Sequence, residues 1–446
     1  MKNFFKKIEF PNQEKQIIIL LIISFFLHFF ILNYPLETIF DEIYFSKFAG
    51  SYFTHQYYFD IHPPLGKLII AGFLKVAGFN SELNFSEIGQ PISSITAILL
   101  RFLPALFGTL FIILIYFLIL KMGLSEKAAF LGSWLALFEN AILTHSRLAL
   151  IDIFLLFFGF LSLYFLISYF KDKQKRIIFL ILAVVFSTFA FSIKWTGLTF
   201  FMIVLFGFVF NLCKRFSFKK LFVLFFTIIF SLLIYCLIFA LHFSILNMPG
   251  PGNKFMSPDF NNGKLSTFQK VVELNKQMYI SNASITAFHS YSSKWYEWVI
   301  GKKAIWYWSK STDNSRGDVF LLPNPIIWFS ALFCVFFSIL ILTIKRLRKK
   351  MPKIFYLLIF GFFANLLPFI FITRAAFLYH YFPSLIFGIL IIAVLYDTFF
   401  KTKSDLGYFG YLALVLLVFI LFSPLTYGVL LPIEINYFYR LLLRPF

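Results

Sequence analysis

Charged residues and cysteine are scarce in this sequence. Only 13% of the 446 residues carry a charge, and the chain has three cysteines. Cys213, Cys236 and Cys334 all lie inside apolar stretches, so they indicate no disulfide framework. With 60% hydrophobic residues and 69 phenylalanines, the chain has more apolar surface than the core of a soluble globule can bury. The composition therefore excludes a soluble globule and predicts a polytopic membrane protein.

Motifs for soluble nucleotides and for common metal sites are also missing. The sequence has no P-loop, no paired CxxC and no HExxH, and no GxGxxG stands where a nucleotide-binding fold could form. A soluble nucleotide donor is therefore disfavoured, and a lipid-borne donor would meet the same chemical need outside the cytoplasm.

Apolar runs of about twenty residues, long enough to cross a bilayer as helices, recur along the chain. They predict an all-α polytopic fold with about eleven membrane helices, near residues 17–35, 92–120, 128–143, 147–169, 177–193, 197–213, 221–246, 324–344, 354–372, 378–399 and 408–430. Basic clusters stand between these runs at Lys2/Lys6/Lys7/Lys15, Lys121/Lys127, 171–176, 214–220, 345–350 and Lys401/Lys403. The positive-inside rule places these clusters and the N-terminus in the cytoplasm and the C-terminus outside.

Two long loops, at about 36–91 and 247–323, then face outward with most of the remaining polar residues. We expect three parts: an N-terminal transmembrane catalytic module at 1–246, which includes the first outer loop, then a second outer loop at 247–323 with an amphipathic helix and a tryptophan-rich segment, then a C-terminal four-helix transmembrane module at 324–446. Functional residues concentrate on loops held by a rigid scaffold. The arrangement predicts chemistry at the outer membrane–water boundary.

The first outer loop carries two acidic clusters. Asp41 and Glu42 follow the first helix, where a carboxylate could take a proton from a hydroxyl nucleophile. The alternative is that this pair caps the next helix. Further on, DIHPPLGK places Asp60, His62 and Lys67 around two prolines that rigidify the backbone. This turn suits an anionic headgroup, or it is only a braced turn with a snorkelling lysine.

Further ionisable residues stand at the outer ends of the expected helices. They are Arg101, Arg147, Asp152, Lys194, Arg374 and His380. Ionisable groups at membrane depth are costly, so they either form structural ion pairs between helices or serve a function, and arginine is suited to hold phosphate. Cations for a phosphate beside a carboxylate base describe transfer of a group from a lipid phosphate to an acceptor hydroxyl.

Several stretches resemble the protein O-mannosyltransferases, the dolichyl-phosphate-mannose–protein mannosyltransferases. They are FDEIYFSKFAGSYFTHQYYFDIHPPLGKLIIAG, LLRFLPALFGTL, ENAILTHSRLALID, FSIKWTGL, FHSYSSKWYEW and RAAFLYHYFP. They occur in the family's order over most of the chain, although the family favours Asp where Glu139 stands and the large MIR insertion of eukaryotic members is absent.

The resemblance implies a fold of the GT-C type and an inverting transferase that moves mannose from a polyprenyl phosphate to Ser or Thr of proteins. It implies that Asp41 is the catalytic base, that Glu42 assists it, and that Arg147 compensates the departing phosphate. The expected donor site comprises Asp60, His62, Lys67, Arg101, Arg147, Asp152, Lys194, Arg374 and His380. The expected acceptor groove is bordered by His289, Lys294, Trp295 and Trp298. A compact bacterial form would face the periplasm from the plasma membrane.

Alternatives remain at this point. The same donor chemistry could serve a lipid A or other glycan acceptor, because aminoarabinose transferases share the acidic pair and a Pro-Pro turn. A transporter of the lipid-linked sugar would need polar residues on both sides of the midplane and inverted repeats, which are not evident. A divalent cation on Asp41, Glu42 and Asp60 and a dimeric assembly both stay open, and a nucleic-acid partner is not expected.

Overall fold

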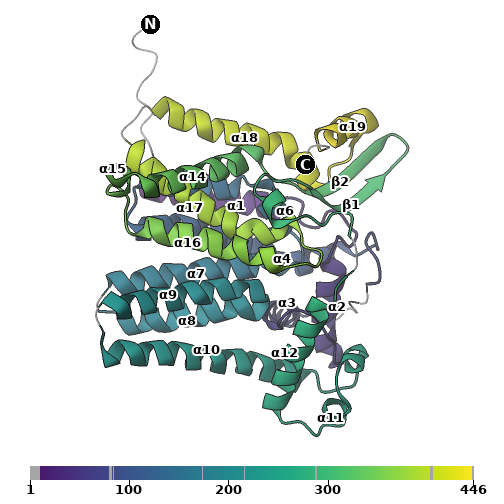
Figure 1. Ribbon diagram of the computed structural model, residues 1–446. Helices are drawn as coiled ribbons and strands as arrows, with labels where there is room; N and C mark the ends of the chain where they lie inside the picture. Colours follow the sequence, from purple (N-terminus) through teal and green to yellow (C-terminus); the bar gives the residue numbers. More distant parts are fainter. Residues whose placement is uncertain are drawn as a thin grey trace.

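The computed structural model describes residues 11–79, 83, 85–172, 174–214, 216–286, 289–401 and 405–443. Most long helices run side by side across one layer (Figure 1). Their bounds are α1 (Gln13–Phe29), α4 (Ser94–Met122), α5 (Glu126–Leu137), α6 (Asn140–Ser146), α7 (Asp152–Lys171), α8 (Arg176–Ile193), α9 (Leu198–Lys214), α10 (Phe218–Ile245), α14 (Pro325–Thr343), α16 (Ile354–Leu366), α17 (Phe382–Phe399) and α18 (Asp405–Tyr427).

Most of the remaining elements gather at one end of the layer (Figure 1). They are α2 (Glu42–Thr54), α3 (Leu65–Val76), α11 (Pro258–Asn261), α12 (Thr267–Ala283), α13 (Trp295–Trp298), α15 (Lys345–Arg348), α19 (Ile433–Leu442) and the 3-10 turns η1 (Trp195–Gly197), η2 (Pro251–Phe255), η3 (Leu367–Phe371) and η4 (Leu378–Tyr381). Strands β1 (Ile305–Ser311), β2 (Ser315–Leu321) and β3 (Leu431–Pro432) form an antiparallel sheet in that order. Helix α15 lies at the opposite end (Figure 1).

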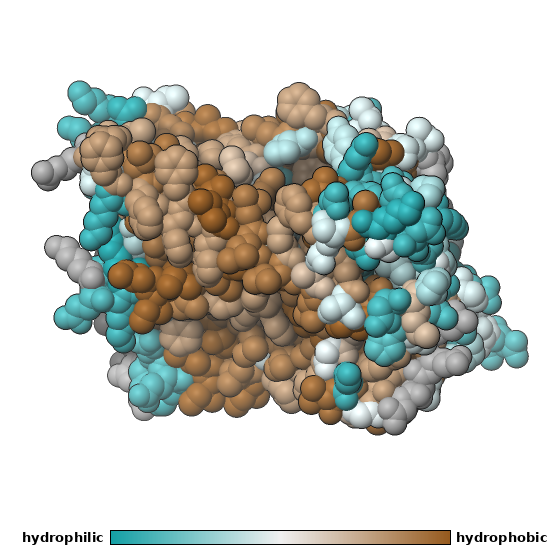
Figure 2. Space-filling view, turned by 90° about the horizontal axis from the view of Figure 1, so that it is seen from below, coloured by the Kyte–Doolittle hydropathy of each residue, from teal (hydrophilic) through white to brown (hydrophobic). Residues whose placement is uncertain are grey.

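The apolar surface forms a broad band between two polar ends (Figure 2). Eight helical segments within the described residues are long and apolar enough to cross a membrane. They are α4, α7, α8, α10, α14, α16 with η3, η4 with α17, and α18. The chain is a multi-pass membrane protein of predominantly helical fold, as its composition predicts. The expected total of eleven spans and the sides of the two termini stay predictions.

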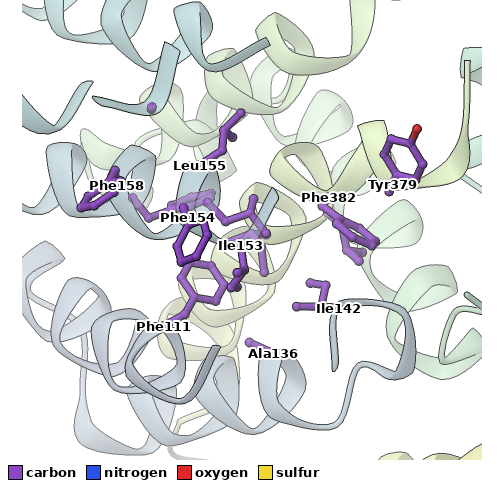
Figure 3. Packing of buried hydrophobic residues seen from close by; sticks show 14 of the residues in the cluster. Phe111, Ala136, Ile142, Ile153, Phe154, Leu155, Phe158, Tyr379 and Phe382 are labelled. Atoms are coloured by element: carbon purple, nitrogen blue, oxygen red, sulfur yellow. The ribbon is translucent and has the colours of Figure 1, made fainter. Parts of the chain in front are cut away.

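The middle of the layer is packed by helices that bury nearly all of their surface. The apolar window of α17 is 94% buried, whereas that of α10 is 22% buried, so α17 is the central helix and α10 faces lipid. Figure 3 shows residues of α4, α5, α6, α7 and α17 meeting in this core. Lipid tails are as apolar as leucine, so such contacts stabilise mainly through close packing. Gly159 and Gly361 permit it, because a Cβ there would overlap the rings of Phe200 and Phe387.

Two elements differ from the helices expected from the apolar pattern. The expected span at 128–143 divides into α5 and α6, because the Glu139 carboxylate accepts a hydrogen bond from the Ala141 backbone N–H and starts a new helix. The helix expected from residue 147 begins at Asp152, after a turn. The β1–β2 hairpin and α19 were not expected, whereas the amphipathic helix of the second outer loop is present as α12.

The basic loops between helices meet at the end of the layer opposite to α2 and α12. The Lys171 ammonium donates to the Lys121 carbonyl oxygen at 2.6 Å, and Lys127 forms an ion pair with Asp405 at 2.6 Å. The clusters at Lys2/Lys6/Lys7 and Lys403 lie outside the described residues, as do Lys173 and Arg215. The described parts of these basic loops thus lie at one end of the layer, which is the pattern that the positive-inside rule describes.

This arrangement predicts opposite labelling of the two ends. In a background with Cys213, Cys236 and Cys334 replaced by alanine, single cysteines at exposed Lys294 and Arg346 should differ in reactivity. A membrane-impermeant maleimide should label Lys294→Cys in intact cells and Arg346→Cys only after the cells are permeabilised. Labelling of Arg346→Cys in intact cells would contradict the orientation.

Candidate active site

Asp41 is the N-cap residue of α2, at the end of the segment that leads from α1 to α2. Phe40, just before it, has a φ of 47°, in the left-handed region that non-glycine residues seldom adopt. The Asp41 carboxylate is half-buried and has no hydrogen bond or ion pair within the described residues. Burial raises its pKa to about 7, with the negative charges of Asp152 and Asp60 adding to the rise and the Lys194 ammonium opposing it. Asp41 is therefore poised to exchange a proton near neutral pH.

Glu42 has the opposite environment, although it is the next residue. Its two carboxylate oxygens accept hydrogen bonds from Arg101 Nε at 2.8 Å and Arg101 Nη2 at 2.9 Å. The backbone N–H groups of Ile39 and Ala149 also donate to it, at 3.0 and 2.9 Å. Arg101 in turn donates to the carbonyl oxygens of residues 32, 35 and 37. The structure thus places Glu42 and Arg101 in the framework of the turn that presents Asp41.

Asp152 joins three other side chains beside Asp41. Lys194 Nζ donates to both Asp152 oxygens, at 2.9 and 2.7 Å. His145 Nε2 lies 2.9 Å from Asp152 Oδ2, and His145 Nδ1 lies 2.7 Å from the Tyr307 hydroxyl. Tyr307 stacks on Phe40 with ring centroids 4.1 Å apart. A continuous polar chain therefore links the start of α7, the residue before η1 and strand β1 next to the turn that carries Asp41.

The turn between α2 and α3 contributes a second ion pair. Lys67 Nζ lies 2.5 Å from Asp60 Oδ2 and 2.7 Å from the carbonyl oxygen of His62. Burial raises the pKa of Asp60, but the Lys67 ammonium and the hydrogen bonds from Lys67 and the His62 backbone outweigh it and leave the pKa below its usual range. Burial lowers the pKa of His62 to about 3, so its imidazole is neutral at physiological pH. This turn therefore supplies the neutral imidazole of His62 and the ammonium of Lys67, whose charge is compensated by Asp60.

Arg374 is half-buried. Within the described residues its guanidinium makes one hydrogen bond of 3.4 Å, to the neighbouring Ala375 carbonyl oxygen, so most of its donors have no partner there. His380 lies close by, with its ring stacked on Trp298 at 5.8 Å and Nδ1 held 2.9 Å from the Phe377 carbonyl oxygen. Arg374 can therefore bind an anion without first losing an ion pair.

Arg147 lies elsewhere than the sequence-based expectation of a phosphate ligand suggests. Its guanidinium donates to the carbonyl oxygens of Leu27 and His28 at 2.9 and 2.8 Å, and its centre lies 4.4 Å from the Tyr427 ring. These carbonyls belong to the last turn of α1, whose dipole and unpaired C=O groups favour a cation. Arg147 thus ties α1 to α6 and α18.

The four residues expected to border the acceptor differ in accessibility. Trp298 is fully buried and donates to the Ser293 hydroxyl at 3.0 Å, so it packs beneath the surface and supports His380. Lys294 and His289 are exposed, and Trp295 is half-buried. The structure therefore leaves Lys294, His289 and Trp295 able to contact an acceptor.

Tyr307 and Tyr379 are site residues that the sequence analysis missed. Both lie within electrostatic range of Asp41, and the Tyr379 ring is 5.2 Å from the Lys194 ammonium. The aromatic segments IWYW and FLYHY contain them, but aromatic residues are so common here that the pattern carries no distinguishing signal. Among the described residues, no three His, Cys, Asp or Glu side chains converge in an arrangement that would hold a metal ion.

Sequence profiles of one family match both halves of the chain. The profile described as dolichyl-phosphate-mannose-protein mannosyltransferase matches residues 18–247. The profile of the C-terminal four TMM region of protein-O-mannosyltransferase matches residues 267–443. Together the two profiles cover most of the chain, with the C-terminal profile following the first one along the sequence.

Curated relatives carry related names. Dolichyl-phosphate-mannose–protein mannosyltransferase 4 of Schizosaccharomyces pombe is 33% identical over 261 residues, 54% of this chain and 34% of that protein. Protein O-mannosyltransferase 1 of Drosophila melanogaster is 38% identical over 138 residues, 31% of this chain and 16% of that protein. The matched part of this chain thus spans about a third or less of these relatives.

Two solved structures have a similar fold. A chain of the Saccharomyces cerevisiae protein O-mannosyltransferase Pmt1-Pmt2 complex bound to the sugar donor superimposes with a TM-score of 0.84 at 19% identity, over 94% of this chain and 91% of that chain. The apo oligosaccharyltransferase of Archaeoglobus fulgidus gives a TM-score of 0.52 at 14% identity, over 95% of this chain and 57% of that one. These likenesses show the fold, which agrees with the expected GT-C type.

The Glu42–Arg101 pair predicts a large stability effect. Glu42→Gln leaves the Arg101 charge buried without its counter-ion, which should reduce the free energy of unfolding by about 3–5 kcal/mol. Thermal unfolding in detergent, followed by tryptophan fluorescence, should show a clearly lower Tm, whereas Glu434→Gln on the exposed side of α19 should not. Removing both charges with Glu42→Gln/Arg101→Met should recover part of the loss. A wild-type Tm for Glu42→Gln would contradict this role.

Proposed function

The chain belongs to the dolichyl-phosphate-mannose–protein mannosyltransferase family, and on this premise we propose that it transfers mannose from a polyprenyl-phosphate carrier to Ser or Thr hydroxyls of proteins. One observation carries the proposal. Of the four acidic side chains expected at the site, Glu42, Asp60 and Asp152 are each held by a cation, whereas Asp41 has no partner among the residues that the structure describes. A base must be free to accept a proton, and Asp41 meets that condition.

The reaction would be a single displacement at the anomeric carbon. Asp41 takes the proton of the acceptor hydroxyl, and the hydroxyl oxygen forms the bond to C1. The bond between C1 and the phosphate oxygen breaks on the opposite side, and its electron pair leaves with the phosphate. Attack from the opposite face inverts the configuration at C1. The aromatic walls of Tyr307 and Tyr379 keep the site partly dry, which strengthens every charge interaction inside it.

The departing phosphate needs positive charge, and Arg374 is the best placed to supply it. Within the described residues its guanidinium makes one long hydrogen bond, whereas Arg147 Nη1 donates to two carbonyl oxygens of α1. Lys194 would add a second charge, and the imidazoles of His62 and His380 would form hydrogen bonds to the sugar phosphate. Three further residues would act through their ion pairs. Lys67 would hold Asp60, Arg101 would hold Glu42 and Asp152 would hold Lys194 in place.

Acceptor, location and assembly complete the proposal. Exposed Lys294, His289 and Trp295 would border the incoming polypeptide. The basic loops at the far end of the layer support placing the site on the outer face, the periplasmic face of a bacterial plasma membrane. The similar yeast structure is a complex of two chains, and we include a dimeric assembly in the proposal.

Loss of the Asp41 carboxylate should abolish transfer without unfolding the protein. Purified wild type should transfer labelled mannose from polyprenyl-phosphate mannose to a Ser/Thr-rich peptide, and Asp41→Asn should be slower by about 100-fold or more, because a general base contributes that much. Asp259→Asn, an exposed carboxylate on α11, serves as the matched control and should keep wild-type activity. The Tm of Asp41→Asn should not fall, because no partner is lost.

Two other outcomes would overturn parts of the proposal. Equal transfer by wild type and Asp41→Asn would remove Asp41 from the mechanism. Label that moves into a lipid or glycan fraction, with none in peptide, would leave the donor chemistry in place and reject a protein acceptor.

A further inference from the structure

A groove of about 620 Å³ lies behind the sheet, on the face opposite the catalytic turn. Alternate residues of a strand point to opposite faces. Tyr307 points toward His145, whereas its neighbour Trp306 lines the groove. Trp306 pairs across the hairpin with Phe320, and the two rings form the groove floor. This cavity is called the outer groove below.

Two guanidinium groups are held rigidly at the outer groove. Asp318 is fully buried and accepts hydrogen bonds from Arg316 Nε at 3.3 Å and from Arg440 Nη2 at 3.0 Å. Asn436 Nδ2 also donates to Asp318, at 2.9 Å. Within the described residues, Arg440 Nη1 and Arg316 Nη2 donate to nothing. The shared carboxylate thus fixes two arginines that still have free donors.

The outer groove carries an excess of positive charge. Lys303 also lines the groove, with Nζ 2.9 Å from the Ser292 carbonyl oxygen, so three cations line the cavity and two of them contact the buried carboxylate of Asp318. One negative charge against three positive ones leaves a net charge of +2 on these four side chains. Oriented guanidinium groups bind carboxylates and phosphates well. The expected occupant therefore carries negative charge.

The outer groove also lies close to Asp41 by two routes. Its rim includes Ser290, next to His289, whose ring packs on Phe377 with centroids 4.9 Å apart. Phe377 stacks on Tyr379 at 5.5 Å, and Tyr379 is in electrostatic range of Asp41. Across the strand, Trp306 adjoins Tyr307, which packs on the turn before Asp41. An extended chain advances about 3.3 Å per residue, so a polypeptide could occupy both places at once.

We propose that the outer groove binds the acceptor polypeptide a few residues away from the modified Ser or Thr and selects an acidic side chain there. The inference rests on the proposed function and adds a rule for which acceptors are used. A polypeptide is the occupant that the position of the outer groove favours. Its rim at Ser290 adjoins the segment that carries exposed His289 and Lys294, which are proposed to border the acceptor.

Matched acceptor peptides test the inference. Each peptide carries one Thr and a single Glu, Gln or Lys at varied distance on either side, and KM is measured with the wild type. At one flanking distance the Glu peptide should have a KM about two- to five-fold below that of the Gln peptide, as an exposed ion pair provides, with the Lys peptide worst.

Variants of the groove should change this preference. Lys303→Glu should shift it toward the Lys peptide, and Arg440→Gln should weaken it while Arg316 and Asn436 still hold Asp318. Lys264→Gln, an exposed lysine of the same loop that pairs with Asp259, is the control and should leave every KM unchanged. Because a reversed preference cannot come from partial unfolding, the charge reversal separates binding from stability.

The outcomes separate this inference from the function on which it rests. Transfer with equal KM for all peptides would overturn the groove inference and leave the transferase standing. Activity that depends on anionic vesicles and loses that dependence in Arg440→Gln, without any peptide preference, would assign the groove to lipid and overturn it too. If no peptide is modified, the proposed function fails. Fluorescence anisotropy with labelled peptides then still tests the groove inference. Wild type should bind the Glu peptide best and Lys303→Glu should bind the Lys peptide best, and the absence of any charge preference would overturn the inference.

Discussion

The buried ion pair between Glu42 and Arg101 is the constraint on which the site depends. A carboxylate taken out of water is costly unless it is paired and fully hydrogen-bonded, and Glu42 receives two donors from Arg101 and two from the backbone. The other N–H groups of Arg101 donate to carbonyl oxygens of the segment between α1 and α2. The turn is thereby held from both sides, and the adjacent Asp41 is presented without a partner of its own. Two neighbouring acids thus differ completely in environment.

The same division recurs among the cations. Lys67 compensates Asp60, Lys194 compensates Asp152, and Arg147 caps α1, so each of these charges is already used in the free protein. Arg374 remains open, and a ligand phosphate would meet a cation that requires no prior rearrangement. One free acid and one free guanidinium, each surrounded by compensated charges and aromatic rings, form a site arranged for charge that develops during a reaction. The outer groove has a similar arrangement, because a buried carboxylate there orients two arginines that retain free donors within the described residues.

Much of the fold was predictable, because apolar runs, proline-braced turns and basic clusters act locally. The membrane-spanning character, the amphipathic α12 and the grouping of the described basic loops follow from them, and the family resemblance is confirmed by the profile matches. Tertiary contacts decide the rest. Glu139 interrupts an apolar run, and its buried carboxylate is stabilised by a hydrogen bond from the backbone N–H of Asn324, which lies far away in sequence. The β1–β2 hairpin likewise packs on helices far away in sequence. Arg147 and Arg374 look alike in sequence, and only their surroundings distinguish a helix cap from a free cation. The catalytic and binding roles of the named residues remain predictions.

The pH dependence of kcat/KM tests the central claim, that Asp41 is a partly desolvated base without a partner. Burial raises its pKa to about 7, and the base must be ionised to accept a proton, so the rate should fall as the pH drops through that value. Mannose transfer by purified wild type between pH 5 and 9, at pH values where the Tm is constant, should show an acidic limb with a midpoint near 7. A rate that stays level down to pH 5, as an ordinary aspartate with a pKa of about 3.9 would give, would contradict the account.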